Sequence, residues 1–69
     1  MREIERAEKR ILELLDKHDL PPSRILDRLG DSFDELTLRE AMLDLVTRQE
    51  ARWKFGRKLS RRHDELVHG

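Results

Sequence analysis

Apolar residues recur three or four positions apart over the first part of the chain, from residue 2 to residue 19. This spacing places them on one side of an α-helix, in a stripe wide enough to face a core. The pattern therefore predicts an amphipathic helix over residues 2–19. Pro21 and Pro22 end it, because proline disfavours helical backbone in the preceding residue and has no N–H to donate. The stripe consists of Ile4, Ala7, Ile11, Leu12, Leu14 and Leu15.

A second, short helix is predicted over residues 23–30, in the segment SRILDRLG. The prolines or Ser23 open this helix, and Gly30 is suited to its C-terminal end. A connector over residues 31–36 follows and leads into the next apolar stripe. The residues of these two segments that are predicted to face the core are Ile25, Leu26, Leu29, Phe33 and Leu36.

The third predicted helix covers residues 37–50, in TLREAMLDLVTRQE. Thr37 and Glu40 match a capping box, in which each side chain bonds a free backbone N–H at the start of the helix. Ser32 and Glu35 match the same motif, so an earlier start is also consistent with the sequence. The buried stripe of this helix is predicted to be Leu38, Ala41, Met42, Leu45 and Val46, with Leu43 exposed and available to a partner.

The period of the pattern changes from helical to alternating at Ala51. Alternation of apolar and polar residues is typical of a β-strand, and Gly56 marks a turn. We therefore predict a β-hairpin, as part of a two-stranded or three-stranded wing. A three-residue loop over 55–57 pairs Trp53 with Leu59 on the core face. The other face of the hairpin then carries Arg52, Lys54, Lys58 and Ser60.

The fold class predicted from these elements is mainly α with a small β-hairpin. Residues 1–62 form the domain and residues 63–69 a C-terminal tail. Trp53 has two interpretations, because an aromatic ring within a basic segment can stack on a base or belong to the core. We predict that it is buried, and that Phe55 at the tip of the hairpin is exposed. The residues named as core are Leu14, Leu26, Leu45 and Trp53.

The charge of the chain is balanced overall but unevenly distributed. The 69 residues include 15 basic and 15 acidic side chains. Residues 1–50 hold nine basic and thirteen acidic residues, whereas residues 51–69 hold six basic and two acidic ones. All six of these basic residues lie in ARWKFGRKLSRR, which contains no acid. Such a segment is either a solvated hairpin face or a surface for phosphate.

Several classes of protein are not favoured by the sequence. The charged N-terminus has no apolar segment typical of a signal peptide, and no run is long enough to cross a membrane. The absence of cysteine fits a reducing compartment, so we expect a cytoplasmic or nucleoid-associated protein. The serines lack a nucleophile motif, and no cofactor is expected, so we do not expect an enzyme. His18, His63 and His68 lack the spacing of metal ligands.

The order of short helix, turn, capped helix and hairpin in RILDRLGDSFDELTLREAMLDLVTRQEARWKFGRKLSR resembles a winged helix-turn-helix domain. The resemblance implies a small DNA-binding protein, such as a transcriptional regulator or an architectural factor, that binds double-stranded DNA and can form a homodimer. In this family the third helix lies in the major groove and the wing contacts the backbone or the minor groove. The residues implied as DNA contacts are Arg39 in the helix and Arg52, Lys54, Arg57, Lys58, Arg61 and Arg62 in the wing.

The third helix departs from the pattern of a DNA-reading helix. Its segment from Asp31 to Asp44 holds five acidic residues and one basic residue, Arg39. The chain has no asparagine, and Gln49 lies at the far end of the helix, so the usual readers of adenine are missing. The alternative function is a protein-interaction module or adaptor that uses the acidic face of this helix. Leu43 and Phe55 are then the candidate contacts with a protein partner.

Overall fold

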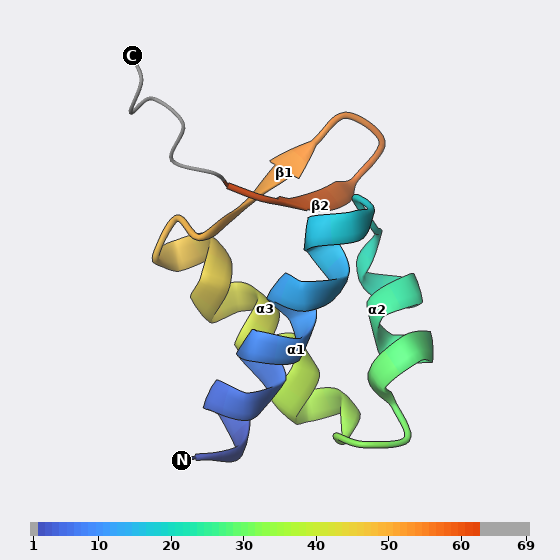
Figure 1. Ribbon diagram of the computed structural model, residues 1–69, viewed down its shortest axis with the longest axis vertical. Helices are drawn as coiled ribbons and strands as arrows, with labels where there is room; N and C mark the ends of the chain where they lie inside the picture. Colours follow the sequence, from blue (N-terminus) through green and yellow to red (C-terminus); the bar gives the residue numbers. More distant parts are fainter. Residues whose placement is uncertain (1, 63–69) are drawn as a thin grey trace.

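Three helices and a two-stranded hairpin follow one another in the computed structural model, which describes residues 2–62 (Figure 1). The mainly α fold predicted from the sequence is confirmed, and it has the layout of a helix-turn-helix followed by a wing. The predicted tail, with His63 and His68, lies outside the described residues. The elements are α1 (Glu3–Lys17), α2 (Pro22–Leu29), α3 (Glu35–Thr47), β1 (Ala51–Lys54) and β2 (Lys58–Arg61).

The start of α3 lies two residues earlier than the Thr37 capping box predicts. Asp34 is the N-cap, and its Oδ1 accepts a hydrogen bond from the Thr37 backbone N–H at 3.3 Å. The Thr37 hydroxyl, which also hydrogen-bonds the carboxylate, and then this backbone bond hold the pKa of Asp34 below its usual value. Aspartate is among the strongest N-cap residues, and it satisfies an N–H that has no partner within the helix. Neither Thr37 nor Ser32 is the N-cap, so both predicted capping boxes are wrong, whereas the earlier start that the sequence left open is confirmed.

The early start of α3 decides where Leu36 points. The sequence predicts Leu36 as a core anchor in a connector, but Leu36 lies in the first turn of the helix and its exposed fraction is 65%. At about 100° per residue, it falls on the side of the helix opposite Leu38 and Leu45. Phe33, one residue before the cap, is the anchor that is buried, as predicted.

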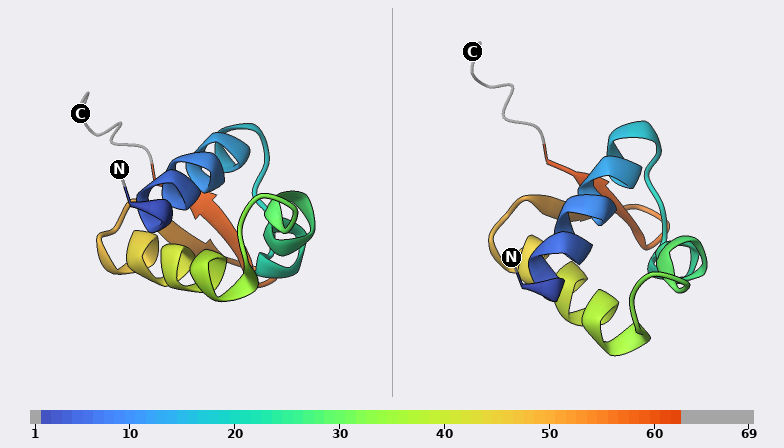
Figure 2. Two further views of the ribbon diagram at one scale, coloured as in Figure 1. Left: turned by 90° about the horizontal axis from the view of Figure 1, so that it is seen from below. Right: turned by 60° about the horizontal axis from the view of Figure 1, so that its bottom comes forward.

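The hairpin lies across one end of the molecule, beside the C-terminal end of α1 and the start of α2 (Figures 1 and 2). Its strands are antiparallel, with Trp53 opposite Leu59 and a loop over residues 55–57, so the predicted register is confirmed. Leu20, between α1 and α2, forms a β-bridge with Leu59 on the open side of β2. The two backbone hydrogen bonds of this bridge measure 3.1 and 2.7 Å. The bridge attaches the wing to the helices.

The core is formed by the packing of α1 against α3, and residues of α2 and β2 complete it. Leu45, predicted as core, is fully buried. Leu14 and Leu26 are only partly buried, at the margin of the core. The largest side chains with almost no exposed surface come from every layer, which joins the helices and the hairpin into one folding unit. These side chains are Ile11, Ile25, Leu38, Leu45 and Leu59.

One buried carboxyl group joins α1 to the end of α3. Glu8 has an exposed fraction of 7%, and its Oε1 accepts a hydrogen bond from Arg48 Nη2 at 2.7 Å. Arg48 also pairs with Asp44 at 3.1 Å and with Glu50 at 3.3 Å. Three acids thus share one guanidinium. Burial, with Asp44 as its hydrogen-bond partner, raises the pKa of Glu8 to about 7.

This group is expected to make the domain less stable as the pH rises from about 5 to 8. The folded state holds a proton on Glu8 that the unfolded state releases near its ordinary pKa of 4.5. The contribution is therefore complete below that value and is lost as the pH rises towards 7, by roughly 1–3 kcal/mol. Urea unfolding at pH 5 and pH 8 measures the difference. Glu8→Gln keeps a hydrogen-bonding side chain that cannot ionise, so it should remove most of this dependence. An unchanged pH dependence in Glu8→Gln contradicts the assignment.

Candidate nucleic-acid interface

The wing turns through a loop that contains two residues with left-handed backbone conformation, which glycine adopts at the lowest cost. Gly56 has φ of 89° and Arg57 has φ of 59°, both in the left-handed region. Phe55, which precedes them, is fully exposed, as predicted. The loop therefore carries an aromatic ring and a guanidinium at the outer end of the hairpin, where no other element covers them.

Three cations of the wing have no ion-pair partner within residues 2–62. They are Arg52 in β1, Arg57 in the loop and Lys58 at the start of β2, and all three side chains are exposed. The sequence predicted all three as phosphate contacts. Exposed cations grouped on a hairpin can bind phosphate without first breaking an internal pair.

Two other cations of the wing are paired with acids of α1 and of the turn after it. Lys54 Nζ lies 3.3 Å from Asp19 Oδ2, and Arg61 Nη1 lies 2.6 Å from Asp16 Oδ2. Arg62 donates a hydrogen bond to Gln49 Oε1 at 2.8 Å. The sequence predicted these cations as contacts for DNA but not the acids that face them.

Asp19 holds the wing against the end of α1. Its pKa lies below the usual value, first because Ser60 donates a hydrogen bond to the carboxylate and then because Lys54 does. The register places Ser60 on the predicted face with Arg52, Lys54 and Lys58, but Ser60 is buried. It is buried because its hydroxyl bonds Asp19 and β2 packs on the helices.

The outward face of α3 is apolar and acidic rather than basic. Leu36 and Leu43 are exposed by 65% and 67%, so the predicted exposure of Leu43 is confirmed. Arg39, the one cation predicted to read bases, donates from Nε to Glu35 Oε2 at 2.8 Å. Glu40 is exposed beside these residues. A face of this composition repels phosphate. Arg39 therefore lies on the outward face of α3 as predicted, but without the positive charge around it that binding in the major groove needs.

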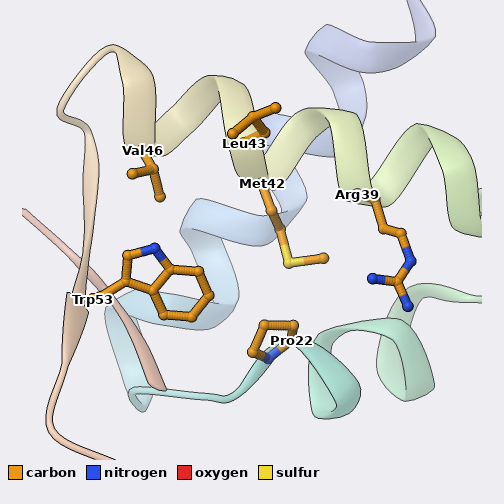
Figure 3. Close-up of a pocket in the computed structure, with 6 residues that line it drawn as sticks. All are labelled: Pro22, Arg39, Met42, Leu43, Val46 and Trp53. Carbon is orange, nitrogen blue, oxygen red and sulfur yellow. The ribbon is translucent and has the colours of Figure 1, made fainter. Parts of the chain in front are cut away.

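Trp53 is not a core residue, which corrects the prediction from the alternating pattern. Its exposed fraction is 54%, and it lines a groove of about 190 Å³ between β1 and α3. Figure 3 shows the indole facing Val46 and Met42 of α3, with Pro22 on the opposite wall. Leu20 bridges β2, whereas β1 has β2 as its one strand neighbour within residues 2–62. Arg39 and Leu43 complete the lining of this groove.

Three further residues of the exposed surface were not predicted from the sequence: Asp16, Asp19 and Leu36. Asp16 and Asp19 flank the end of the first predicted helix, and nothing in their local spacing indicates that a hairpin more than 30 residues later packs against them. The exposure of Leu36 could have been predicted from Asp34 as an N-cap, since a helix that starts at residue 35 turns Leu36 outward.

Within residues 2–62, no group of His, Asp and Glu side chains is arranged to hold a metal ion. None of the helices in this part of the chain has the length and apolar character needed to cross a bilayer. Comparisons of the chain with protein-family models, with curated proteins and with solved structures find no match. The surface feature from which a function can be inferred is the basic wing, which follows an apolar and acidic α3.

Proposed function

We propose that this chain is a winged-helix DNA-binding protein that contacts the phosphates of double-stranded DNA with its wing. The observation that carries the proposal is the group formed by Arg52, Arg57 and Lys58, exposed on one hairpin and free of ion pairs within residues 2–62. Phosphate contacts supply most of the affinity of non-specific DNA binding. The proposed activity is DNA binding and not catalysis. The proposed location of the protein is the cytoplasm or the nucleoid.

Lys54 adds a fourth cation to this group when DNA is present. Its partner Asp19 forms an exposed ion pair with it at 3.3 Å, and such pairs contribute little to stability. A phosphate can therefore replace Asp19 at small cost. Arg61 is held more closely, at 2.6 Å from Asp16, and is expected to contribute less.

The face of α3 argues against reading of bases in the major groove. Leu36, Glu40 and Leu43 occupy its outward side, and Arg39 is paired with Glu35. Contacts to the backbone position a protein without specifying a sequence. The proposed role is therefore architectural or weakly selective, and Arg39→Ala should leave sequence preference unchanged.

The test is a fluorescence-anisotropy titration of a random-sequence duplex at several salt concentrations. Three or four phosphate contacts predict a slope of roughly −3 to −4 in a plot of log affinity against log salt, since each contact contributes about −0.9. Duplexes of different sequence should bind alike. A chain with no affinity at low salt, or with a slope near zero, contradicts the proposal.

A second candidate function is supported by the exposed apolar side chains of α3. Leu43 and Trp53 line one groove, and Leu36 is exposed on the same helix as Leu43. Exposed apolar patches mark protein-interaction sites. An adaptor domain would use this surface and the acidic side chains beside it. If the titration detects no DNA binding, protein interaction becomes the better explanation of the exposed apolar side chains on α3.

A further inference from the structure

Phe55 is the aromatic side chain that no other part of residues 2–62 covers. Its exposed fraction is 101%. Phe33 is buried in the core, and the indole of Trp53 lines the groove beside α3 (Figure 3). The Phe55 ring therefore contributes nothing to the packing of the fold, and it is open to solvent.

The loop that carries Phe55 leaves free space around its tip. Gly56 and Arg57 both have positive φ, of 89° and 59°, and they reverse the chain directly after Phe55. A Cβ added to Gly56 would meet no atom within 4 Å. A flat ligand can therefore approach the tip without displacing any other part of the described chain.

Cations lie on both sides of this ring along the hairpin. Lys54 precedes Phe55, Arg57 follows it by two residues, and Lys58 lies directly opposite Lys54 in the antiparallel register. Like charges directly opposite one another are unfavourable in a sheet. Asp19, 3.3 Å from Lys54, offsets part of this repulsion, and a phosphate beside the two lysines would offset more. The tip thus combines an open aromatic ring with cations suited to phosphate.

We infer that the tip of the wing binds an unpaired base, which stacks on Phe55 while Lys54, Arg57 and Lys58 contact the phosphates beside it. This inference rests on the proposed function and narrows its ligand to duplex DNA that contains an unpaired base. Bases stack on exposed aromatic rings, and neighbouring cations hold the strand. Consecutive residues of the protein are about 3.8 Å apart and consecutive phosphates of a DNA strand about 3.4 Å, so the ring and its cations have the spacing of neighbouring nucleotides.

The strength of stacking favours an unpaired base over an intact duplex. Opening a base step costs at least as much free energy as a single aromatic ring returns by stacking. A base that is already unpaired carries the least of this cost. For such a base, stacking on one ring raises the affinity by about tenfold or more.

An anionic lipid surface also places phosphate beside an apolar phase, but it fits the tip less well. Stable attachment to a bilayer needs a broad apolar face or two separate anchors, and the tip offers one ring. Trp53, two residues before Phe55, faces the groove beside α3 and adds nothing at the tip. The single ring between cations therefore favours nucleic acid.

Fluorescence anisotropy of the full chain with three labelled DNAs tests the inference. The first is a perfect duplex, the second has an extra unpaired adenine in the middle of one strand, and the third has an abasic nucleotide at that position. The second and third DNAs have the same charge and the same interruption, and they differ in a base that can stack. The unmodified chain should bind the second DNA about tenfold or more tightly than either of the others.

Variants of Phe55 assign this preference to its ring. Phe55→Ala should bind the three DNAs with equal affinity, set by the cations. Phe55→Trp should keep the preference because it keeps an aromatic ring, whereas Phe55→Leu, which is apolar without a ring, should lose it. Leu36→Ala is the matched control, since it truncates another exposed apolar side chain outside the wing, and it should show the preference of the unmodified chain.

Each failure has a separate meaning. Equal binding of the three DNAs by the unmodified chain, or a preference that persists in Phe55→Ala, overturns the inference and leaves the proposed function standing. The absence of affinity for all three DNAs at low salt overturns both. Vesicles containing phosphatidylserine are the last arm. Vesicle binding that is lost in Phe55→Ala, with no effect of that variant on any of the DNAs, assigns the ring to a lipid surface and overturns the inference.

Discussion

Leu45→Ala is expected to leave the domain largely unfolded at room temperature. The side chain is fully buried among the residues that join α3 to α1. Truncation of a buried leucine costs about 2–5 kcal/mol, because the transfer free energy is lost and a cavity remains. A domain of this size has little stability in reserve, since small chains bury a smaller fraction of their surface.

Thermal unfolding followed by circular dichroism measures this effect. Leu43→Ala is the matched control, because Leu43 lies two residues earlier on the same helix but is exposed by 67%. At low concentration this control should change the free energy of unfolding by at most about 0.5 kcal/mol. A cooperative transition of Leu45→Ala with a midpoint close to that of the unmodified chain contradicts the place of Leu45 in the core.

Arg57→Glu combined with Lys58→Glu is expected to weaken DNA binding by about 100-fold or more at low salt. Each charge-assisted contact to phosphate contributes about 1.5–3 kcal/mol, and each glutamate adds repulsion. The loss should be the same for every duplex sequence, and the salt slope should fall by about two. The fold should persist, because neither side chain is buried or ion-paired within residues 2–62.

The control for this variant changes the net charge equally at a different place. Arg6 and Lys9 are exposed in the N-terminal half of α1, a segment that lies at the opposite end of the molecule from the hairpin (Figure 1). Arg6→Glu with Lys9→Glu also replaces two cations by two acids. If DNA is held by the wing, this control keeps most of the affinity. Equal losses in the two double variants would show that overall charge, and not the wing, governs binding.

The local pattern of the sequence was sufficient for the elements and for the hairpin register. Helical spacing, two prolines and a change to alternation at Ala51 each depend on neighbouring residues, and backbone conformation responds to neighbours first. The exposure of Leu43 followed from the helical period, and that of Phe55 from its place at the tip of the hairpin. The grouping of basic residues on the wing was also evident, because all of them lie within one short segment.

Only the tertiary structure decided which of these residues are free to act. Lys54 and Arg61 are paired with Asp19 and Asp16, which precede them by more than 30 residues, and no local pattern encodes that contact. Trp53 lies in a surface groove beside α3, although it alternates like a core residue and shares its hairpin face with the buried Leu59. A period of two tells which side chains share a face of a hairpin. Which face is buried depends on how the hairpin packs against distant helices, and that is a property of the assembled fold.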